Sequence, residues 1–209
     1  MLITSNLGAI TYIGQALKKV FVKRIIYLVS ILVFFIGNVA YAQFSVGKQG
    51  NTVFYLVRHA EKDTGSDPVL TKAGYQRAGD LYRALNNIKI QKIFISQYRR
   101  SRLTADSLIV YNGTDTVHYL ADASGDGLFS KLGLLTSNAD AVLIIGHSNT
   151  IPGIIRRLGV TGFQIKEISD YEYDNLYIVK PGRQKRRLIQ KKFGKASIPA
   201  NRTTMKPLE

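Results

Sequence analysis

Several residue types that carry common protein chemistries are absent or rare in this sequence. It contains no cysteine, so it has no disulfide bonds; this fits an oxidising compartment, where disulfides are optional, without indicating one. Only three histidines are present, His59, His118 and His147, and they lack the H-x-x-x-H spacing of zinc sites. No Walker loop occurs, and GDGLFS at 125–130 ends in serine where a dinucleotide-binding loop has glycine. We therefore expect no metal and no cofactor.

Acidic residues are scarce at both ends of the chain. Residues 1–42 contain four Lys or Arg and no acid, and residues 180–209 contain ten Lys or Arg against Glu209 alone. The formal net charge of +15 belongs to these ends, since residues 43–179 hold 15 basic and 13 acidic residues. This distribution removes most of the support for a nucleic-acid-binding protein, and we expect no nucleic-acid partner.

The N-terminal segment has the layout of an export signal. Basic residues at 18–24 precede the apolar run IIYLVSILVFFIG at 25–37, and Ala-Tyr-Ala at 40–42 offers small residues at both positions that a signal peptidase inspects. We predict that residues 1–42 are a signal peptide cleaved after Ala42, and that the protein is exported, to the periplasm if its source is Gram-negative. The alternative is an uncleaved membrane anchor, because the run extended to Ala42 has 18 residues, the low edge of a spanning helix.

Residues 43–194 have the pattern of one α/β domain of ordinary size. Segments with helical spacing separate short β-branched and aromatic runs, which we expect to be strands, at 53–57, 92–96, 116–120, 141–146 and 175–180. Alternating strands and helices predict a three-layer α/β/α sandwich with a mainly parallel central sheet. The basic segment RRLIQ at 186–190 fits a last edge strand with solvated charges, and residues 195–209 fit a basic, disordered tail. Membrane contact is expected only through an uncleaved N-terminus or the basic C-terminal region.

Three helices are predicted between these strands. The first begins after Thr71, a good N-cap, and places Ala78, Leu81, Tyr82 and Leu85 on one face. The segments RSRLTADSLIV and TIPGIIRRLG fit two later helices.

The unusual polar residues follow three of the predicted strands. Arg58 and His59 come directly after the first strand, Ser96 ends the second with Arg100 four residues later, and His147 follows the fourth. Ligands of parallel sheets collect at the carboxyl ends of strands. Each residue taken singly has an ordinary structural interpretation, such as a surface pair or a hydrogen-bonded histidine. Their equivalent positions in the fold favour a shared anion site.

The segment GHSNT at 146–150 has a competing interpretation as a nucleophile elbow with Ser148 as the nucleophile. Thr150 replaces the last glycine of that motif, and no histidine follows the serine to complete a triad. Serine hydrolase chemistry is therefore not expected.

Four motifs together resemble those of the histidine phosphatase superfamily, also called phosphoglycerate mutase-like: LVRHAEK, LTKAGYQRA, Ser96 with Arg100 and Thr104, and IIGHSNT. The resemblance covers about residues 52–180. It implies an α/β sandwich, a phosphohistidine intermediate and no metal. By their places in these motifs, His59 would be the nucleophile, with Arg58, Arg100 and His147 around the phosphate.

The chemistry of these residue types agrees with the roles that the resemblance implies. Arg58 and Arg100 can each offer paired donors to a phosphate dianion, and a neutral His59 can attack phosphorus in line. His147, if protonated, would be a third donor. For the acid that protonates the leaving group, Asp122 is the first choice, with Glu61 and Asp126 as alternatives; a substrate with a good leaving group, such as phosphohistidine, needs less protonation.

The sequence thus predicts an exported, metal-independent phosphatase that hydrolyses a phosphomonoester or a phosphohistidine, borne by a small molecule or a protein. The alternative is a catalytically weak member of the same fold that binds phosphate or a polyanion. A mutase is disfavoured because the connection between Lys62 and Thr71 is too short for a closed lid. The loops expected at 62–71 and 121–140 carry no binding signature, so the sequence does not identify the substrate. It does not indicate the oligomeric state either.

Overall fold

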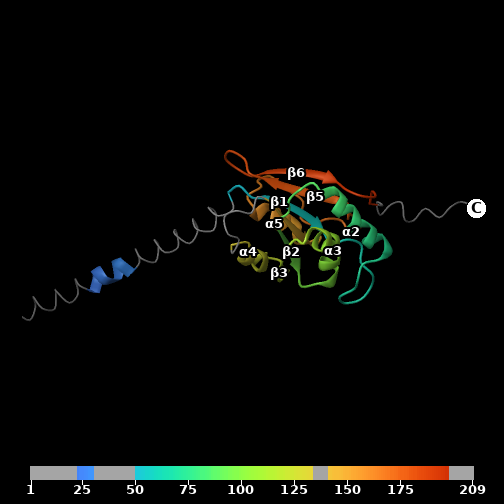
Figure 1. Cartoon of the computed structure of the whole chain (residues 1–209). Coiled ribbons are helices and arrows are strands. Elements are labelled where there is room, and N and C mark those ends of the chain that lie inside the picture. Colours follow the sequence, from blue (N-terminus) through green and yellow to red (C-terminus); the bar gives the residue numbers. More distant parts are fainter. Residues whose placement is uncertain (1–22, 31–49, 134–140, 198–209) are drawn as a thin grey trace, which may run out of the picture. The chain divides into compact units, whose positions relative to one another are not determined.

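The computed structural model describes residues 23–30, 50–133 and 141–197 (Figure 1). The chain divides into two compact units, Met1–Gly47 and Lys48–Glu209. Of the first unit the structure describes one helical segment, 23–30. No helix within the described ranges combines the length and hydropathy needed to span a bilayer. The predicted cleavage site after Ala42 and residues 198–209 of the predicted tail lie outside the described residues, so both stay predictions.

The second unit is built on a six-stranded sheet with the order β3-β2-β4-β1-β5-β6. Its strands are β1 (Val53–Arg58), β2 (Lys92–Ser96), β3 (Thr116–Tyr119), β4 (Ala141–Gly146), β5 (Asn175–Lys180) and β6 (Arg187–Lys192). Strands β1 to β4 run parallel to one another, whereas β5 runs antiparallel to both β1 and β6. The prediction of a mainly parallel sheet is therefore confirmed.

Helices cover both faces of this sheet (Figure 1). They are α2 (Lys72–Leu85), α3 (Arg99–Asn112), α4 (Asp126–Leu132) and α5 (Ile151–Arg157). In β1, Phe54 and Leu56 pack into the core with α4 and α5, whereas Tyr55 and Val57 pack into the core with α2 and α3. Both faces of the strand are buried, so β1 is a continuous apolar and aromatic run from Val53 to Val57 instead of alternating, and it ends in Arg58. This arrangement is the predicted three-layer α/β/α sandwich.

Helix α2 begins as predicted and fixes the loop that follows β1. Thr71 Oγ1 accepts a hydrogen bond of 3.1 Å from the amide of Gly74, and the amide of Thr71 donates to the carbonyl oxygen of Glu61. A side chain at position 74 would collide with that same carbonyl oxygen, so the close approach requires glycine. Leu81 and Leu85 are fully buried on the predicted apolar face.

The prediction of a loop over residues 121–140 was wrong for residues 126–132, which form α4. This short helix is stabilised by Asp122, whose carboxylate accepts hydrogen bonds from the amides of Asp126 and Gly127. Leu128 and Leu132 bury the apolar side of the helix in the core. Three apolar residues in seven, Leu128, Phe129 and Leu132, are too weak a periodic signal to predict such a helix from sequence.

The expected edge strand at 186–190 is present as β6, which begins at Arg187 and ends at Lys192, two residues later than expected. It pairs only with β5 among the described strands and is exposed over most of its length. Charged side chains on such an edge hinder pairing with another chain.

Candidate active site

The carboxyl ends of β2, β4 and β1 meet at one edge of the sheet because these three strands are adjacent and parallel. Arg58 pairs in register with Gly146, and the amide of His59 donates to the carbonyl oxygen of Gly146 at 3.0 Å. The rings of His59 and His147 consequently lie 5.2 Å apart, centre to centre. A pocket of about 320 Å³ is lined by both histidines, by Arg58 and by Arg100. The structure thus places the four predicted phosphate-binding residues in one pocket.

His59 is almost fully buried and its tautomer is fixed by the backbone. Its Nδ1 lies 2.8 Å from the carbonyl oxygen of Ala60. A carbonyl oxygen only accepts, so the neutral ring carries its proton on Nδ1 and leaves a lone pair on Nε2. Burial lowers the pKa of His59 to about 3, and the nearby charges of His147, Arg58 and Arg100 act in the same direction. The imidazole is therefore neutral, which is the form that can act as a nucleophile.

The loop after His59 is held by α3. The amide of Ala60 donates to Thr104 Oγ1 at 2.8 Å, and that hydroxyl donates to the carbonyl oxygen of Arg100 at 2.7 Å. Thr104 is one of the residues of the family-like motif, and its role here is to connect the His59 loop to the turn that carries Arg100.

His147 is held by a buried pair of serines. Its Nε2 lies 3.0 Å from Ser96 Oγ, which lies 2.6 Å from Ser101 Oγ. Burial lowers the pKa of His147 to about 4, with Arg100 and Arg58 adding to the effect. In the free site this ring is neutral, and a bound phosphate dianion would raise its pKa. Sequence reasoning singled out Ser96 but missed Ser101, whose contribution depends on the first turn of α3.

Each of the two arginines stacks on a tyrosine. The Arg58 guanidinium carbon lies 4.2 Å from the centre of the Tyr173 ring, and that of Arg100 lies 4.0 Å from the centre of the Tyr98 ring. The Tyr98 ring also meets His147 edge-on, at 5.3 Å between centres. Such stacking orients a guanidinium without using its hydrogen-bond donors.

The donors of the arginines are only partly used. Arg58 donates to the carbonyl oxygen of Ser169 at 2.9 Å and to Asp170 at 3.2 Å, and Arg100 lies 3.8 Å from Asp67. The Nε–H groups of Arg58 and Arg100 are both buried, and among the described residues neither has a hydrogen-bond acceptor. Buried donors of this kind are rare because leaving one unpaired costs about 1–3 kcal/mol. A tetrahedral oxyanion in the pocket would supply the acceptors.

The three predicted acid candidates all accept hydrogen bonds from neighbouring donors. Asp122 lines the pocket, but Ser124 and the amides of Gly127 and Asp126 donate to it and lower its pKa to about 2. Glu61 accepts three hydrogen bonds from the guanidinium of Arg77. Asp126 accepts from Ser124 and Arg157, which lower its pKa. A general acid must hold a proton near neutral pH, so this geometry does not favour Asp122 in that role.

The other polar residues considered in the sequence lie partly in this pocket and partly outside it. Lys62 and Ser148 line the pocket, and Ser148 Oγ is 3.4 Å from Glu167. His118, for which no role was predicted, is exposed on β3. In the described part of the chain, no three His, Asp or Glu side chains are grouped as metal ligands.

Sequence reasoning missed Tyr98, Tyr173, Asp67 and Asp170. Tyr98 lies two residues before Arg100, so its proximity could have been proposed from the turn between β2 and α3. Tyr173 and Asp170 lie more than 110 residues from Arg58, and no pattern in the sequence links them to it.

Comparison with known families identifies the fold. The model of the histidine phosphatase superfamily (branch 1) matches residues 54–121, which run from β1 through β3 and include Arg58, His59 and Arg100. Over these residues the chain is similar to the histidine phosphatase superfamily. His147 lies beyond the matched segment and enters the site through the pairing of β4 with β1. Among curated proteins, no sequence matches this chain significantly.

Solved structures share this fold at low sequence identity. A proposed phosphohistidine phosphatase, SixA, from Agrobacterium tumefaciens is 22% identical with a TM-score of 0.52, covering 66% of this chain and 96% of its own. The corresponding SixA protein from Nakamurella multipartita is 16% identical with a TM-score of 0.54, covering 67% and 95%. The mycobacterial glucosyl-3-phosphoglycerate phosphatase is 12% identical with a TM-score of 0.50, covering 70% and 100%. At these identities the likeness concerns the histidine phosphatase fold.

Proposed function

We propose that this protein is a phosphatase that transfers the phosphoryl group of its substrate to Nε2 of His59 and then to water. The observation that carries the proposal is the pair of buried arginines, Arg58 and Arg100, whose Nε–H groups have no acceptor within the described part of the chain and lie beside two neutral imidazoles. This arrangement suits a dianionic tetrahedral group, which brings several acceptor oxygens at once.

In the first step, the lone pair of His59 Nε2 forms a bond to phosphorus. The bond from phosphorus to the leaving atom breaks, and that atom keeps the electron pair. Arg58 and Arg100 neutralise the charge that would repel the nucleophile, and the Nδ1–H bond to Ala60 holds the ring in the required tautomer. Catalysis of this kind consists mainly of positioning and charge stabilisation.

In the second step, a water oxygen bonds to phosphorus and the N–P bond breaks, which returns the electron pair to Nε2. The proton released by water passes to the nearest base, and His147, neutral in the free site, can receive it. Ser96 holds the opposite edge of the His147 ring during this exchange.

The leaving group decides the finer substrate class. Hydrogen bonds lower the pKa of Asp122 and of Asp126, and Glu61 is paired with Arg77, so a substrate whose leaving atom needs little help from an acid is favoured. Phosphohistidine meets this requirement when solvent has protonated its other ring nitrogen, because the group that then leaves with the electron pair of the N–P bond is neutral imidazole, a weak base. We therefore favour a phosphohistidine, borne by a small molecule or a protein, over an alkyl phosphate. The names of the SixA relatives agree with this preference.

Leaving-group dependence tests this function. Wild type and His59→Ala would be assayed on a phosphohistidine peptide, on 4-nitrophenyl phosphate and on an alkyl phosphate. We expect turnover to fall steeply in that order, and to be lost with the phosphoenzyme in His59→Ala. The matched control is His118→Ala, which alters an exposed histidine outside the pocket and should leave turnover unchanged. Turnover by His59→Ala, or equal rates on the alkyl and aryl esters, would contradict the mechanism.

A catalytically weak phosphate-binding role is the second candidate. It is favoured by one contact, since Asp170 already occupies a donor of Arg58 in the free protein. Binding of inorganic phosphate without a detectable phosphoenzyme on any of the three substrates would support this role.

Export through residues 1–42 is likewise a proposal. It is supported by the layout of the basic and apolar segments before Ala42. A mass measurement on the mature protein distinguishes cleavage after Ala42 from an uncleaved anchor.

A further inference from the structure

The pocket carries opposite charges at its base and at its mouth. Arg58, His59 and His147 are more than nine-tenths buried and form the base together with Arg100. The remaining charged residues that line the pocket are one lysine and three carboxylates, and they are more exposed: Lys62, Asp122, Glu167 and Asp170. The mouth is therefore net negative although the protein as a whole is strongly basic.

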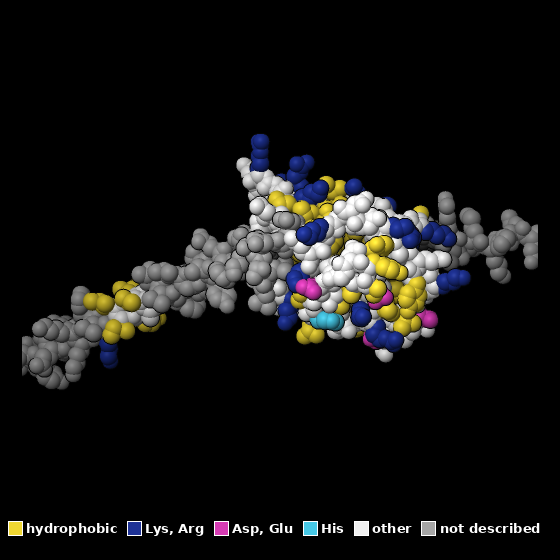
Figure 2. All heavy atoms as spheres, viewed as in Figure 1, with side chains coloured by type: hydrophobic (Ala, Val, Ile, Leu, Met, Phe, Trp, Pro, Cys, Tyr) yellow, Lys and Arg dark blue, Asp and Glu magenta, His cyan; other side chains and the backbone are white. Residues whose placement is uncertain are grey.

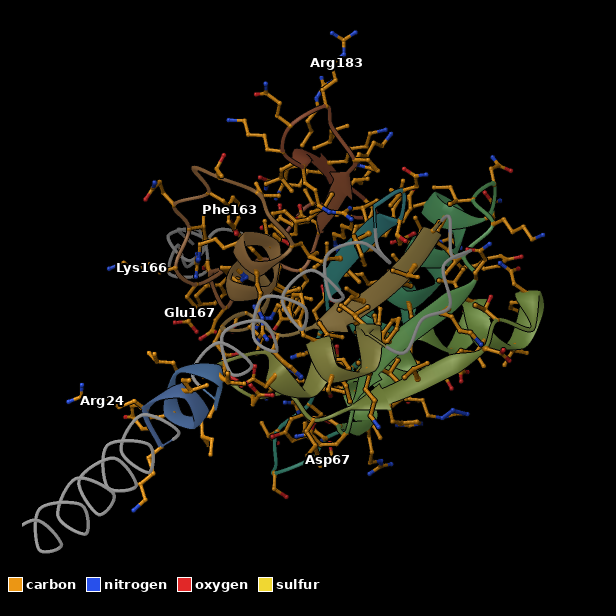
Figure 3. The ribbon with its side chains drawn as sticks, turned by 90° about the vertical axis from the view of Figure 1, so that its left-hand side faces the viewer. Arg24, Asp67, Phe163, Lys166, Glu167 and Arg183 are labelled. Atoms are coloured by element: carbon orange, nitrogen blue, oxygen red, sulfur yellow. The ribbon has the colours of Figure 1, made fainter. Side chains whose placement is uncertain are left out.

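The three carboxylates come from two loops at the same edge of the sheet. Asp122 lies between β3 and α4, and Glu167 and Asp170 lie between α5 and β5, where Figure 3 labels Glu167. The side chain of Asp170 is 83% exposed even though it contacts Arg58. Asp122 is held by the α4 amides, so its charge stays at the mouth. These positions place negative charge around the path that a substrate takes into the pocket.

The proposed function places the phosphate of a substrate beside Arg58. This arginine is nine-tenths buried, lines this pocket and has an Nε–H without an acceptor among the described residues. Arg100 has the same unpaired group in the same pocket. With the phosphate at these donors, a pocket of about 320 Å³ leaves the organic part of the substrate at the mouth, beside the carboxylates.

We propose that Asp122, Glu167 and Asp170 are specificity-determining residues that select phosphates with a positively charged organic part and reject phosphates with further negative charge. The inference rests on the proposed function for the position of the phosphate. The chemical class is a single phosphate next to a cationic nitrogen, as in an N-phosphorylated imidazolium or a phosphate ester of a quaternary amino alcohol. Nucleoside polyphosphates and sugar bisphosphates fall outside it.

The expected preference is moderate, because exposed charges act through water. A carboxylate about 4–6 Å from a cation changes its affinity about threefold in a water-like dielectric, and added salt reduces this effect. Several carboxylates around one cation act together, so we expect about a tenfold preference at low ionic strength.

Binding of two ligands of the same shape isolates the charge. Phosphocholine carries a quaternary ammonium, and 3,3-dimethylbutyl phosphate replaces it with an uncharged carbon. Dissociation constants measured by calorimetry on the full chain give their ratio without requiring turnover. The ratio cancels changes that affect the phosphate alone, such as removal of Asp170 from Arg58. We expect phosphocholine to bind about tenfold more tightly at low salt, and phosphoglycolate, with an added carboxylate, more weakly than either.

The variant Glu167→Gln/Asp170→Asn should bring the ratio of phosphocholine to 3,3-dimethylbutyl phosphate close to 1. Asp122 is left in place because it holds α4. The matched control is Asp115→Asn, which removes an exposed carboxylate outside the pocket and should leave the ratio unchanged. A ratio near 1 in wild type, or a ratio that the double variant does not change, overturns the inference. If no phosphate ligand binds at all, including inorganic phosphate, it is the proposed function that fails.

Discussion

Two regions of this molecule are rich in arginine and lysine, and only one of them has the features of a site. The hairpin of β5 and β6 carries eight Lys or Arg between 175 and 197 without an acid, and these side chains gather where Figure 2 shows dark blue over the hairpin. Arg183, at its tip, extends away from the domain (Figure 3). The pocket has only Arg58, Arg100 and Lys62, yet Arg58 and Arg100 are stacked on tyrosines and hold buried donors without acceptors.

The difference shows that the number of charges does not make an anion site. An exposed lysine is already solvated. An anion that binds it must displace this water, so the net gain in binding free energy is small. A buried guanidinium has lost its water on folding and gains a full charge-assisted hydrogen bond when a phosphate oxygen arrives. Substitutions in the two regions should therefore differ widely in effect.

The largest difference is expected between Arg100→Ala in the pocket and Arg187→Ala on the hairpin. Loss of Arg100 removes a charged donor pair from the transferring phosphate, so the transition state should lose about 3 kcal/mol of stabilisation. This loss should lower kcat/KM roughly a hundredfold. Arg187→Ala should change kcat/KM less than twofold. Steady-state kinetics on 4-nitrophenyl phosphate measure both, and comparable losses would remove the distinction between the regions.

A smaller effect is expected from the serine behind His147. Ser96→Ala leaves the buried Nε2 of His147 without its partner, which costs about 1–2 kcal/mol and should lower kcat roughly tenfold. Ser101→Ala removes only the outer hydroxyl of the chain and should have a weaker effect. Because misoriented His147 would titrate differently, the pH profile of kcat should shift in Ser96→Ala and not in Ser101→Ala. Identical profiles in the two variants would assign Ser96 a packing role only.

The buried histidines of the pocket should also make the stability of the protein depend on pH. The pKa values of His59 and His147 are lowered to about 3 and about 4, below the ordinary 6.5 of the unfolded chain. Below pH 6.5 the unfolded chain therefore binds more protons, and stability falls as the pH decreases from 6.5 towards 4. Thermal unfolding should show this decline, and it should be less steep in His147→Ala. A flat profile over this range would contradict the burial of neutral histidines.

The smallest effect is expected on the hairpin itself. Replacing Arg183, Lys185 and Arg187 together by alanine should change the free energy of unfolding by less than about 0.5 kcal/mol per residue, since these side chains are exposed. Phosphate affinity should stay the same at physiological salt, because distant charges are screened. Urea unfolding and phosphate titration measure the two quantities. A large loss of phosphate affinity would show that the hairpin charges act on the pocket.

The outline of the fold could be predicted from local patterns. The apolar run of β1 and the Thr71 cap of α2 depend on neighbours within a few residues, and both are present as predicted. Helix α4 was missed because the capping by Asp122 and the burial of Leu128 come from tertiary packing. The antiparallel direction of β5 could not be predicted either, since no short-range signal fixes how a strand enters the sheet after the long loop from α5.

By itself the sequence determined which residues follow the strands, and therefore which residues could meet at the edge of a parallel sheet: Arg58, His59, Arg100 and His147. Only the tertiary structure decided their surroundings. The tyrosine stacks, the neutral state of both imidazoles and the carboxylates at the mouth depend on contacts between segments far apart in the chain, such as those of Arg58 with Asp170 and with Tyr173. Burial and charge are properties of the space around a residue, and the chain fills that space only when it folds.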